Sequence, residues 1–156
     1  DQRFYAGIAL GWSLIRIADA QAALPLIDKL MLEARRLEAD PSTRQCQGRN
    51  RDNRLKRLVS TWTVVVHLAL LTGRDELIGD IAAAAHHLLE RTDLNRIPAD
   101  VLLRMSSNWA RCLVWQWPTS PDHLKTDLDH LFQGIQHERC GISLPDEARL
   151  VYSLIG

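Results

Sequence analysis

The sequence lacks the features that identify several large classes of protein. No run approaches the ~20 unbroken apolar residues of a membrane-spanning helix. The longest such stretch, Val64 to Leu71, is interrupted by His67. The first residues show no secretory leader pattern. The chain has only three cysteines, without a repeated spacing, which argues against a disulfide framework and favours a cytoplasmic (intracellular) location.

Motifs of common enzyme classes are also absent. There is no glycine-rich phosphate loop, no G-x-S-x-G elbow and no paired-aspartate motif. The adjacent pair His86-His87 does not make the His-Asp dipeptide of one class of metal-dependent phosphohydrolases. Cys112 lies in an apolar stretch, which is typical of a core cysteine rather than a nucleophile. We therefore expect no enzymatic activity and no cofactor.

What the sequence does contain is ordinary for a soluble globular domain. Its 156 residues are 46% hydrophobic and 24% charged, with no net charge. This length fits one domain covering residues 1–156. We also expect the chain to be a piece of a longer protein, because it begins at Asp1 without Met and ends on "VYSLIG", which reads as an unfinished helix.

Apolar residues recur at spacings of three and four throughout, with stop signals between the segments, so the sequence predicts an all-α fold. Pro25 suits a first helical turn, Asp52 or Asn53 suits an N-cap, and Gly73 suits a C-terminal stop. The predicted six to seven helices cover residues 2–19, 24–39, 53–72, 75–91, 98–117 and 121–138, and a segment from 145 onward.

One segment has a competing interpretation. The β-branched run in "TWTVVVHLALL", residues 61–71, would also suit a strand. We favour a helix, because all the neighbouring segments are helical and a lone strand has no partner.

Three tryptophans indicate a repeated unit. Trp12, Trp62 and Trp109 are 50 and 47 residues apart, and each lies in the first helix of a predicted helix pair. Apolar residues follow each of them at the same offsets in the second helix. A period of this size predicts stacked antiparallel helical hairpins, with Trp62 buried at the centre.

The segment "LALLTGRDELIGDIAAAAHHLLE", residues 68–90, resembles the turn and second helix of a tetratricopeptide unit. Gly73 stands at the turn, and the small residues Ala82 and Ala85 stand in the second helix. The chain as a whole is similar in architecture to tetratricopeptide and HEAT-type α-solenoids, although its repeat is longer. The resemblance implies a right-handed superhelical stack of hairpins that acts as a protein-binding scaffold.

Positive charge is concentrated in one stretch of this neutral chain. Residues 43–60 hold six basic side chains and one acidic one, Asp52, so the remainder carries a charge of about −5. Three of the basic residues fall at the predicted start of a helix, where the dipole disfavours cations and favours anions. The predicted partner- or anion-binding residues are Arg44, Arg49, Arg51, Arg54, Lys56 and Arg57.

This basic segment has three interpretations. Its arginines could pair with acidic residues of the same chain, in a solvated surface loop. They could bind an acidic protein partner, or a phosphate ligand such as nucleic acid. We expect Arg49, Arg51, Arg54 and Arg57 to be mostly exposed. Nucleic acid is the less favoured ligand, because no aromatic residue is interleaved to stack on bases.

Histidines recur every seven residues at 123, 130 and 137, and we do not expect this stripe to form a metal site. Residues seven apart on a helix are ~10 Å apart, which is too far to share one ion. Half of a metal site could be formed by Asp127 with His123 or His130, or by His137 with Cys140. No matching half-site appears elsewhere in the sequence. We expect no metal.

These observations favour a scaffold domain for protein–protein interaction, without catalysis and without membrane contact, whose partner has an acidic surface. An anion- or nucleic-acid-binding module using residues 44–57 is the first alternative. A small-molecule-binding helical domain is the second.

Overall fold

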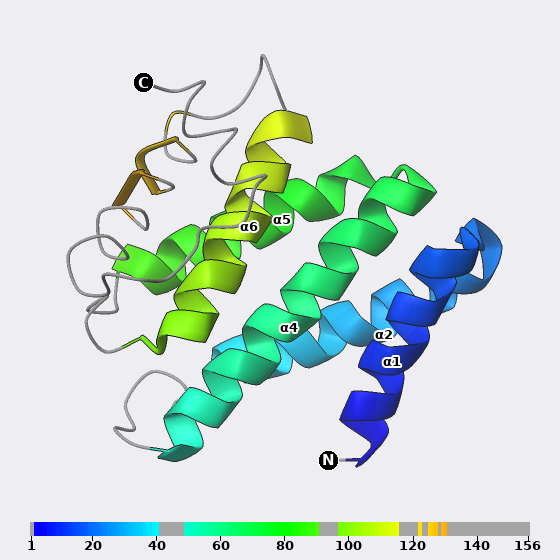
Figure 1. The fold of residues 1–156 in the computed structure, drawn as a ribbon, viewed down its shortest axis with the longest axis horizontal. Helices are drawn as coiled ribbons and strands as arrows, with labels where there is room; N and C mark the ends of the chain where they lie inside the picture. The colour runs from blue at the N-terminus through cyan, green and yellow to red at the C-terminus, as the bar shows by residue number, and fades with distance from the viewer. Residues whose placement is uncertain are drawn as a thin grey trace. The chain divides into compact units, whose positions relative to one another are not determined.

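The structure, a computed structural model, describes residues 2–40, 49–90 and 97–115, together with 122, 125–127 and 129–130. No strand occurs among them, so the all-α prediction is confirmed for this part of the chain. The predicted helix from Pro145 lies outside the described residues, as does most of the one over 121–138. The helices (Figure 1) are α1 (Gln2–Ile17), α2 (Ala20–Ala39), α4 (Arg49–Thr72), α5 (Asp75–Glu90) and α6 (Ala99–Trp115).

The chain divides into two compact units, Asp1–Ile81 and Ala82–Gly156. The first unit contains α1, α2, α4 and the first half of α5. The second contains the rest of α5 and α6. A single domain over residues 1–156 stays a prediction.

Helix α4 is the centre of the first unit, where it packs against both α1 and α2 (Figure 1). Its residues Asp52–Thr72 are long and apolar enough to cross a membrane by length and composition. The core position of α4 accounts for that composition, because most of these residues are buried within the protein. The apolar side chains buried from this helix are Leu55, Leu58, Val59, Trp62, Val64, Val65, Val66, Leu68 and Ala69.

The β-branched run at 61–71 lies within α4, so the helical interpretation of this segment is confirmed. Its threonines use their hydroxyl groups inside the helix. Thr61 donates to the carbonyl of Arg57 at 2.9 Å, and Thr63 donates to that of Val59 at 2.7 Å. These bonds satisfy polar groups that would otherwise be costly next to an apolar core.

A two-residue turn joins α4 to α5. Gly73 has φ +71°, a left-handed conformation that glycine adopts without strain. The next amide, Arg74 N–H, donates back to the carbonyl of Ala69 at 3.0 Å. This is the Schellman arrangement that ends a helix, and it confirms Gly73 as the stop.

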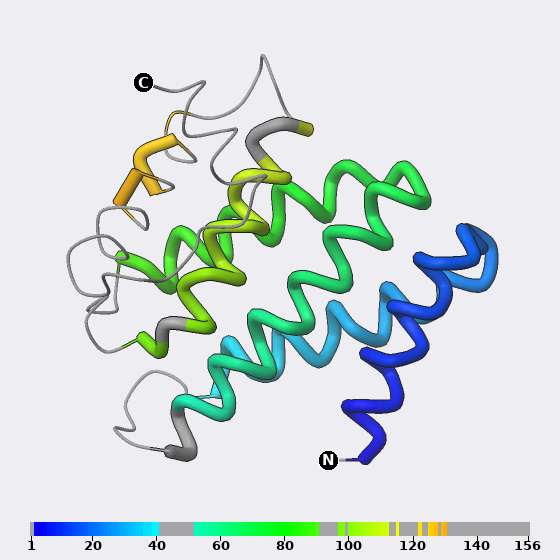
Figure 2. The backbone as a smooth tube through the Cα atoms, viewed as in Figure 1, coloured from blue at the N-terminus to red at the C-terminus, as the bar shows by residue number. Residues whose placement is uncertain are grey.

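The turn between α1 and α2 has the same form, although no glycine is present. Ala18 adopts φ +54°, and the Asp19 N–H donates to the carbonyl of Leu14 at 3.2 Å. A left-handed alanine costs roughly 1–2 kcal/mol. The predicted helix over 2–19 nevertheless ends within two residues of the observed end at Ile17. Figure 2 traces the backbone through both tight turns.

Helix α2 begins at Ala20, four residues earlier than predicted, because Asp19 caps it. The Asp19 carboxylate accepts the Ala22 N–H at 3.0 Å. The prediction that Pro25 lies in the first turn is therefore wrong, and Pro25 sits inside the helix. Pro25 has no N–H to donate to the carbonyl of Gln21. Gln21 is exposed, so water can satisfy this carbonyl.

Helix α4 also begins earlier than predicted, at Arg49 rather than near residue 53. Asp52 and Asn53 are helical residues and not N-caps, so that part of the prediction is wrong. The polar residues before Leu55 continue the helix because arginine is a good helix former, and asparagine and aspartate are tolerated in helices.

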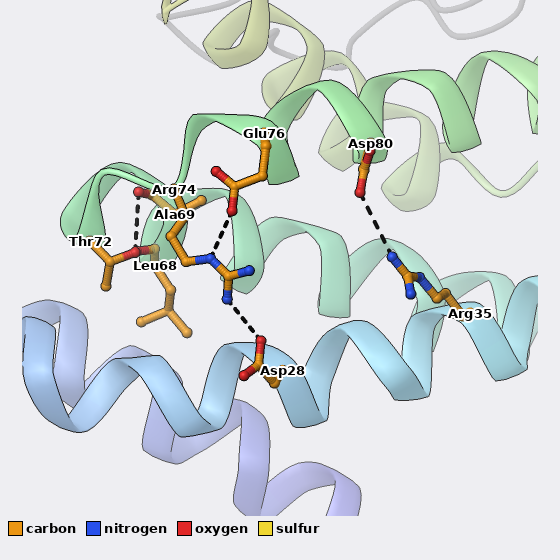
Figure 3. Close-up of polar contacts among 8 residues, drawn as sticks. All are labelled: Asp28, Arg35, Leu68, Ala69, Thr72, Arg74, Glu76 and Asp80. Carbon is orange, nitrogen blue, oxygen red and sulfur yellow. Dashed lines mark hydrogen bonds and ion pairs between the residues drawn. The ribbon is translucent and has the colours of Figure 1, made fainter.

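Arginines connect α2 to the turn and first half of α5 within the first unit (Figure 3). The Arg74 guanidinium donates to Asp28 Oδ1 at 2.8 Å and to Glu76 Oε1 at 2.9 Å. Arg35 pairs with Asp80 at 3.8 Å between exposed side chains. The hydrogen bond from Arg74 holds the pKa of the Glu76 carboxyl below its ordinary value.

The tryptophans differ in environment. Trp62 is fully buried, as predicted, and its indole Nε1–H donates to Glu38 Oε1 at 3.3 Å. Trp12 is 37% exposed, and its ring meets His67 edge-on with centroids 5.0 Å apart. Trp12 lies six residues before the turn residue Ala18, whereas Trp62 lies eleven before Gly73. Trp12 and Trp62 are therefore not equivalent positions, and that expectation is wrong.

Two glycines of α1 set how closely it approaches its neighbours. A Cβ placed on Gly11 would overlap Val64 Cγ1 of α4. A Cβ placed on Gly7 would lie 3.7 Å from Leu30 Cδ2 of α2, which is an ordinary contact. The backbone of α1 thus lies directly against α4 at Gly11, whereas space remains at Gly7.

Alanine substitutions should therefore have opposite effects at the two glycines. Gly7→Ala should raise the free energy of unfolding by about 0.5–1 kcal/mol, through helix propensity. Gly11→Ala should lower it by about 1–3 kcal/mol, because the methyl group forces α1 away from α4. Denaturant unfolding of the two variants measures both changes. Equal effects of the same sign would show that α1 does not pack on α4 as described.

Arg74→Ala should raise the pKa of Glu76 toward its ordinary value. Because the folded-state pKa is lowered, Glu76 stabilises the fold above its unfolded pKa of about 4.3. That stabilisation is lost as the pH falls through the lower folded-state pKa. NMR titration of the Glu76 carboxyl measures the difference, with Arg35→Ala as the control that should leave it unchanged. An identical pKa in Arg74→Ala and the parent would contradict the contact.

Candidate functional site: the basic start of helix α4

The six basic residues predicted as a site are not all described by the structure. Arg44 lies outside the described residues. Arg49 and Arg51 are in the first turn of α4, and only their backbone is described.

Arg54 points from α4 to the end of α2. Its Nη1 lies 2.6 Å from Oδ2 of Asp40, the residue that follows the last turn of α2. Both side chains are a little over one-third exposed. The pair is thus a short ion pair within the first unit, and it ties the beginning of α4 to the C-terminus of α2.

Arg57 contacts both α1 and α2. Its Nη2 lies 3.4 Å from Glu33 Oε1 of α2. The guanidinium carbon also lies 4.5 Å from the centre of the Phe4 ring of α1, the geometry of a cation–π contact. Because the Arg57 side chain is only one-quarter exposed, these contacts are less screened than those of a surface arginine.

Lys56 lies elsewhere on the helix. At about 100° per residue it points roughly 200° away from Arg54, and it is exposed. The described part of the basic segment therefore does not form one surface. The expectation that Arg54 and Arg57 are mostly exposed is wrong, because carboxylates in α2 and at its C-cap draw the two side chains inward.

The earlier start of α4 also changes the electrostatic argument. Arg54, Lys56 and Arg57 are in the second and third turns rather than the first. The helix dipole acts mainly on the first turn. The dipole therefore contributes little at these three residues, and the partner- or anion-binding site stays a prediction.

A second polar cluster lies in the second unit around Asp127, which is buried. His86 Nδ1 of α5 lies 2.8 Å from Asp127 Oδ2 and 3.0 Å from Oδ1. The indole Nε1–H of Trp109, also buried, donates to Asp127 Oδ2 at 3.4 Å. Asp127 thus joins residues 125–127 to α5 and α6.

The other ring nitrogen of His86 is also directed at a carboxylate. Its Nε2 lies 3.4 Å from Glu90 Oε1, one helical turn further along α5. A histidine that acts as a general base directs one nitrogen at a reacting group. Here both nitrogens face structural carboxylates, so the cluster is suited to holding the second unit together.

The remaining sequence candidates give no reactive centre among the described residues. Cys112 is buried in α6, and this burial raises the pKa of its thiol to about 12, so the thiolate needed for nucleophilic chemistry is disfavoured. His130 is exposed. No group of three or more His, Cys, Asp or Glu among the described residues could hold a metal ion. His123, His137 and Cys140 lie outside the described residues.

Sequence reasoning missed the contacts that cross between helices. Asp127 and His86 are 41 residues apart, so helical spacing gives no sign of the pair. The adjacency of His86 and His87 is a local feature, but it does not indicate a partner on another segment. Arg57 was included in the predicted site, but its contacts with Glu33 and Phe4 depend on the packing of three helices.

No protein-family model, no curated protein and no solved structure matches this chain. The resemblance to tetratricopeptide and HEAT-type solenoids stays a prediction. The function is therefore inferred from the chain's own residues.

A double-mutant cycle on Arg54 and Asp40 tests whether the basic segment serves the fold. The single variants Arg54→Ala and Asp40→Ala, and the double variant, should show a coupling free energy of about 0.5–1 kcal/mol, as expected for a half-exposed ion pair. The control cycle, Lys56→Ala with Asp40→Ala, should show coupling near zero, because Lys56 points away. Urea unfolding of the six proteins gives both values, and zero coupling for Arg54 would leave this arginine available for another role.

Proposed function

We propose that the chain is a protein-interaction domain without catalytic activity, which binds an acidic amphipathic helix of its partner on the outer face of α1. One observation carries this proposal: the side of α1 that points away from α2 and α4 is both apolar and exposed. Tyr5 is 63%, Leu10 51% and Ile17 68% exposed. Exposed apolar surface gathered on one face is typical of a binding site.

The outer face of α1 has a shape that suits a helix. Tyr5 and Trp12, seven residues apart, form one ridge, and its Trp12 end lies against His67 of α4. Leu10 and Ile17 form a second ridge. The exposed residues between the ridges are the small Ala6, Ala9 and Ser13, with Gln2 and Arg16 at the two ends. Small residues between two ridges allow another helix to approach closely, as in ridge-into-groove packing.

The charges on α1 indicate the sign of the partner. Arg3 and Arg16 are its only charged residues, and both are exposed. Thirteen residues separate them, which corresponds to about 20 Å along the helix. A partner helix with acidic residues at a similar separation would be complementary at both ends, and such pairs give specificity and faster association.

The proposed architecture is a solenoid of right-handed stacked hairpins. Its support is the repetition of one turn, since α1–α2 and α4–α5 are each joined by two residues with a left-handed first residue. Stacked hairpins of this kind form extended surfaces across neighbouring repeats, and such surfaces serve in binding.

The alternative of an anion- or nucleic-acid-binding module at residues 44–57 receives less support. Arg54 and Arg57 are engaged by Asp40 and Glu33, and Lys56 points in a different direction. A phosphate backbone would need these cations together on one surface.

A designed peptide tests the interaction. An amphipathic helical peptide of about five turns, with a leucine stripe and glutamates about 13 residues apart, should bind in titration calorimetry. The same peptide with lysine in place of glutamate should bind at least about tenfold more weakly, a difference of about 1.4 kcal/mol. Leu10→Ser/Ile17→Ser should lose binding of the acidic peptide.

The matched control is Leu32→Ser, which removes an equally exposed apolar side chain from α2. Its peptide affinity should stay within about twofold of the parent. Circular dichroism should show all variants equally helical. Equal binding of the acidic and basic peptides, or an equal loss in Leu32→Ser, would refute the proposed surface.

A further inference from the structure

A pocket of about 330 Å³ lies within the first unit, between α1 and α2, with Arg57 of α4 on one side. Its volume is at the small end of the range of ~300–1,000 Å³ that ligand pockets occupy. The lining residues are Arg3, Phe4, Gly7, Leu26, Lys29, Leu30, Glu33 and Arg57.

The apolar part of the pocket comes from Phe4 and Gly7 of α1, with Leu26 and Leu30 of α2. Both leucines are buried in the core, so the positions of their side chains are fixed by packing. Gly7 contributes no side chain to the pocket. A Cβ placed on Gly7 would touch Leu30 without a clash, so the space that a side chain would take is left open beside Leu30. The apolar wall is therefore rigid and can accept a short hydrocarbon chain or ring.

The charged part is positive. Arg3, Lys29 and Arg57 line the pocket together with one carboxylate, Glu33. The Arg57 guanidinium is held over the Phe4 ring, so it is already oriented next to the apolar wall. Its distance of 3.4 Å to Glu33 is longer than the 2.7–2.9 Å of a strong charge-assisted bond, so this ion pair is not at its tightest.

We propose that this pocket binds a small amphiphilic carboxylate, with its apolar body against Leu26 and Leu30 and its carboxylate toward Arg57 and Lys29. An arginine fork and a lysine are suited to a carboxylate, and the neighbouring wall removes the apolar body from water. A singly charged carboxylate is favoured over a phosphate dianion, because Glu33 lies close to the headgroup and repels the second charge.

This site can be tested separately from the proposed protein interaction, although Arg3 contributes to both. The pocket is on the side of α1 that faces α2, whereas Leu10 and Ile17 are on the outer face. The Leu10→Ser/Ile17→Ser variant should therefore keep its carboxylate affinity while it loses the helical peptide. Failure of one proposal leaves the other open to its own test.

Octanoate is a suitable probe, with octan-1-ol and acetate as controls for the apolar and the charged halves. In NMR titrations of the full chain, octanoate should shift the methyl signals of Leu26 and Leu30. Its affinity should exceed that of either control by at least about tenfold, because neither control makes both sets of contacts. The octanoate affinity should also fall as salt is added.

Two variants test the pocket in different ways. Gly7→Leu places a side chain in the cavity and also favours the helix, and Lys29→Gln removes one cation from an exposed position. Each should weaken octanoate binding at least about fivefold, whereas Arg36→Gln, an exposed cation of α2 outside the pocket, should change it less than about twofold.

Several outcomes would overturn the proposal. They are the absence of octanoate binding to the parent chain, equal binding of octanol, methyl shifts that do not include Leu26 or Leu30, and equal losses in Lys29→Gln and Arg36→Gln. Because Lys29 is exposed, its variant stays informative even if Gly7→Leu perturbs the packing of α1.

Discussion

The burial of α4 against α1 and α2 is the constraint on which the rest of the first unit depends. Its apolar side chains are buried over most of its length, and Gly11 lets the backbone of α1 lie directly on Val64. Once this contact fixes α1, the outer face of α1 is left toward solvent and the space beside Gly7 remains. The proposed binding face and the proposed pocket are two results of one packing arrangement.

The arginines of the basic segment show how charge is used near such a core. Arg54 and Arg57 pair with carboxylates in α2 and at its C-cap. Part of the positive charge that is clustered in the sequence is therefore paired within the fold. Arg57 has a second contact, the ring of Phe4, and this brings a cation to the edge of an apolar cavity. Arg57, which the sequence predicts to bind an acidic protein surface, thus lies where the proposed small carboxylate would bind.

The sequence predicted the features that depend on local periodicity and on single residues with strong preferences. Gly73 as a stop, the burial of Trp62 and the helical state of 61–71 follow from these. The predicted start of α2 is four residues too late, because the N-cap is Asp19 and Pro25 lies inside the helix. The environments of Trp12, Arg57 and Asp127 could not be predicted, because each depends on which helices pack together, and spacing along one helix carries no such information.

The turn between α1 and α2 has a consequence for how the protein folds. Asp19 donates its N–H to the end of α1 and accepts an N–H at the start of α2, so one residue both closes one helix and opens the next. No intervening loop has to be ordered, and the loop-closure entropy of this hairpin is small. Hairpins with such local contacts form rapidly, so α1 and α2 can meet before the more distant α4 is added to them.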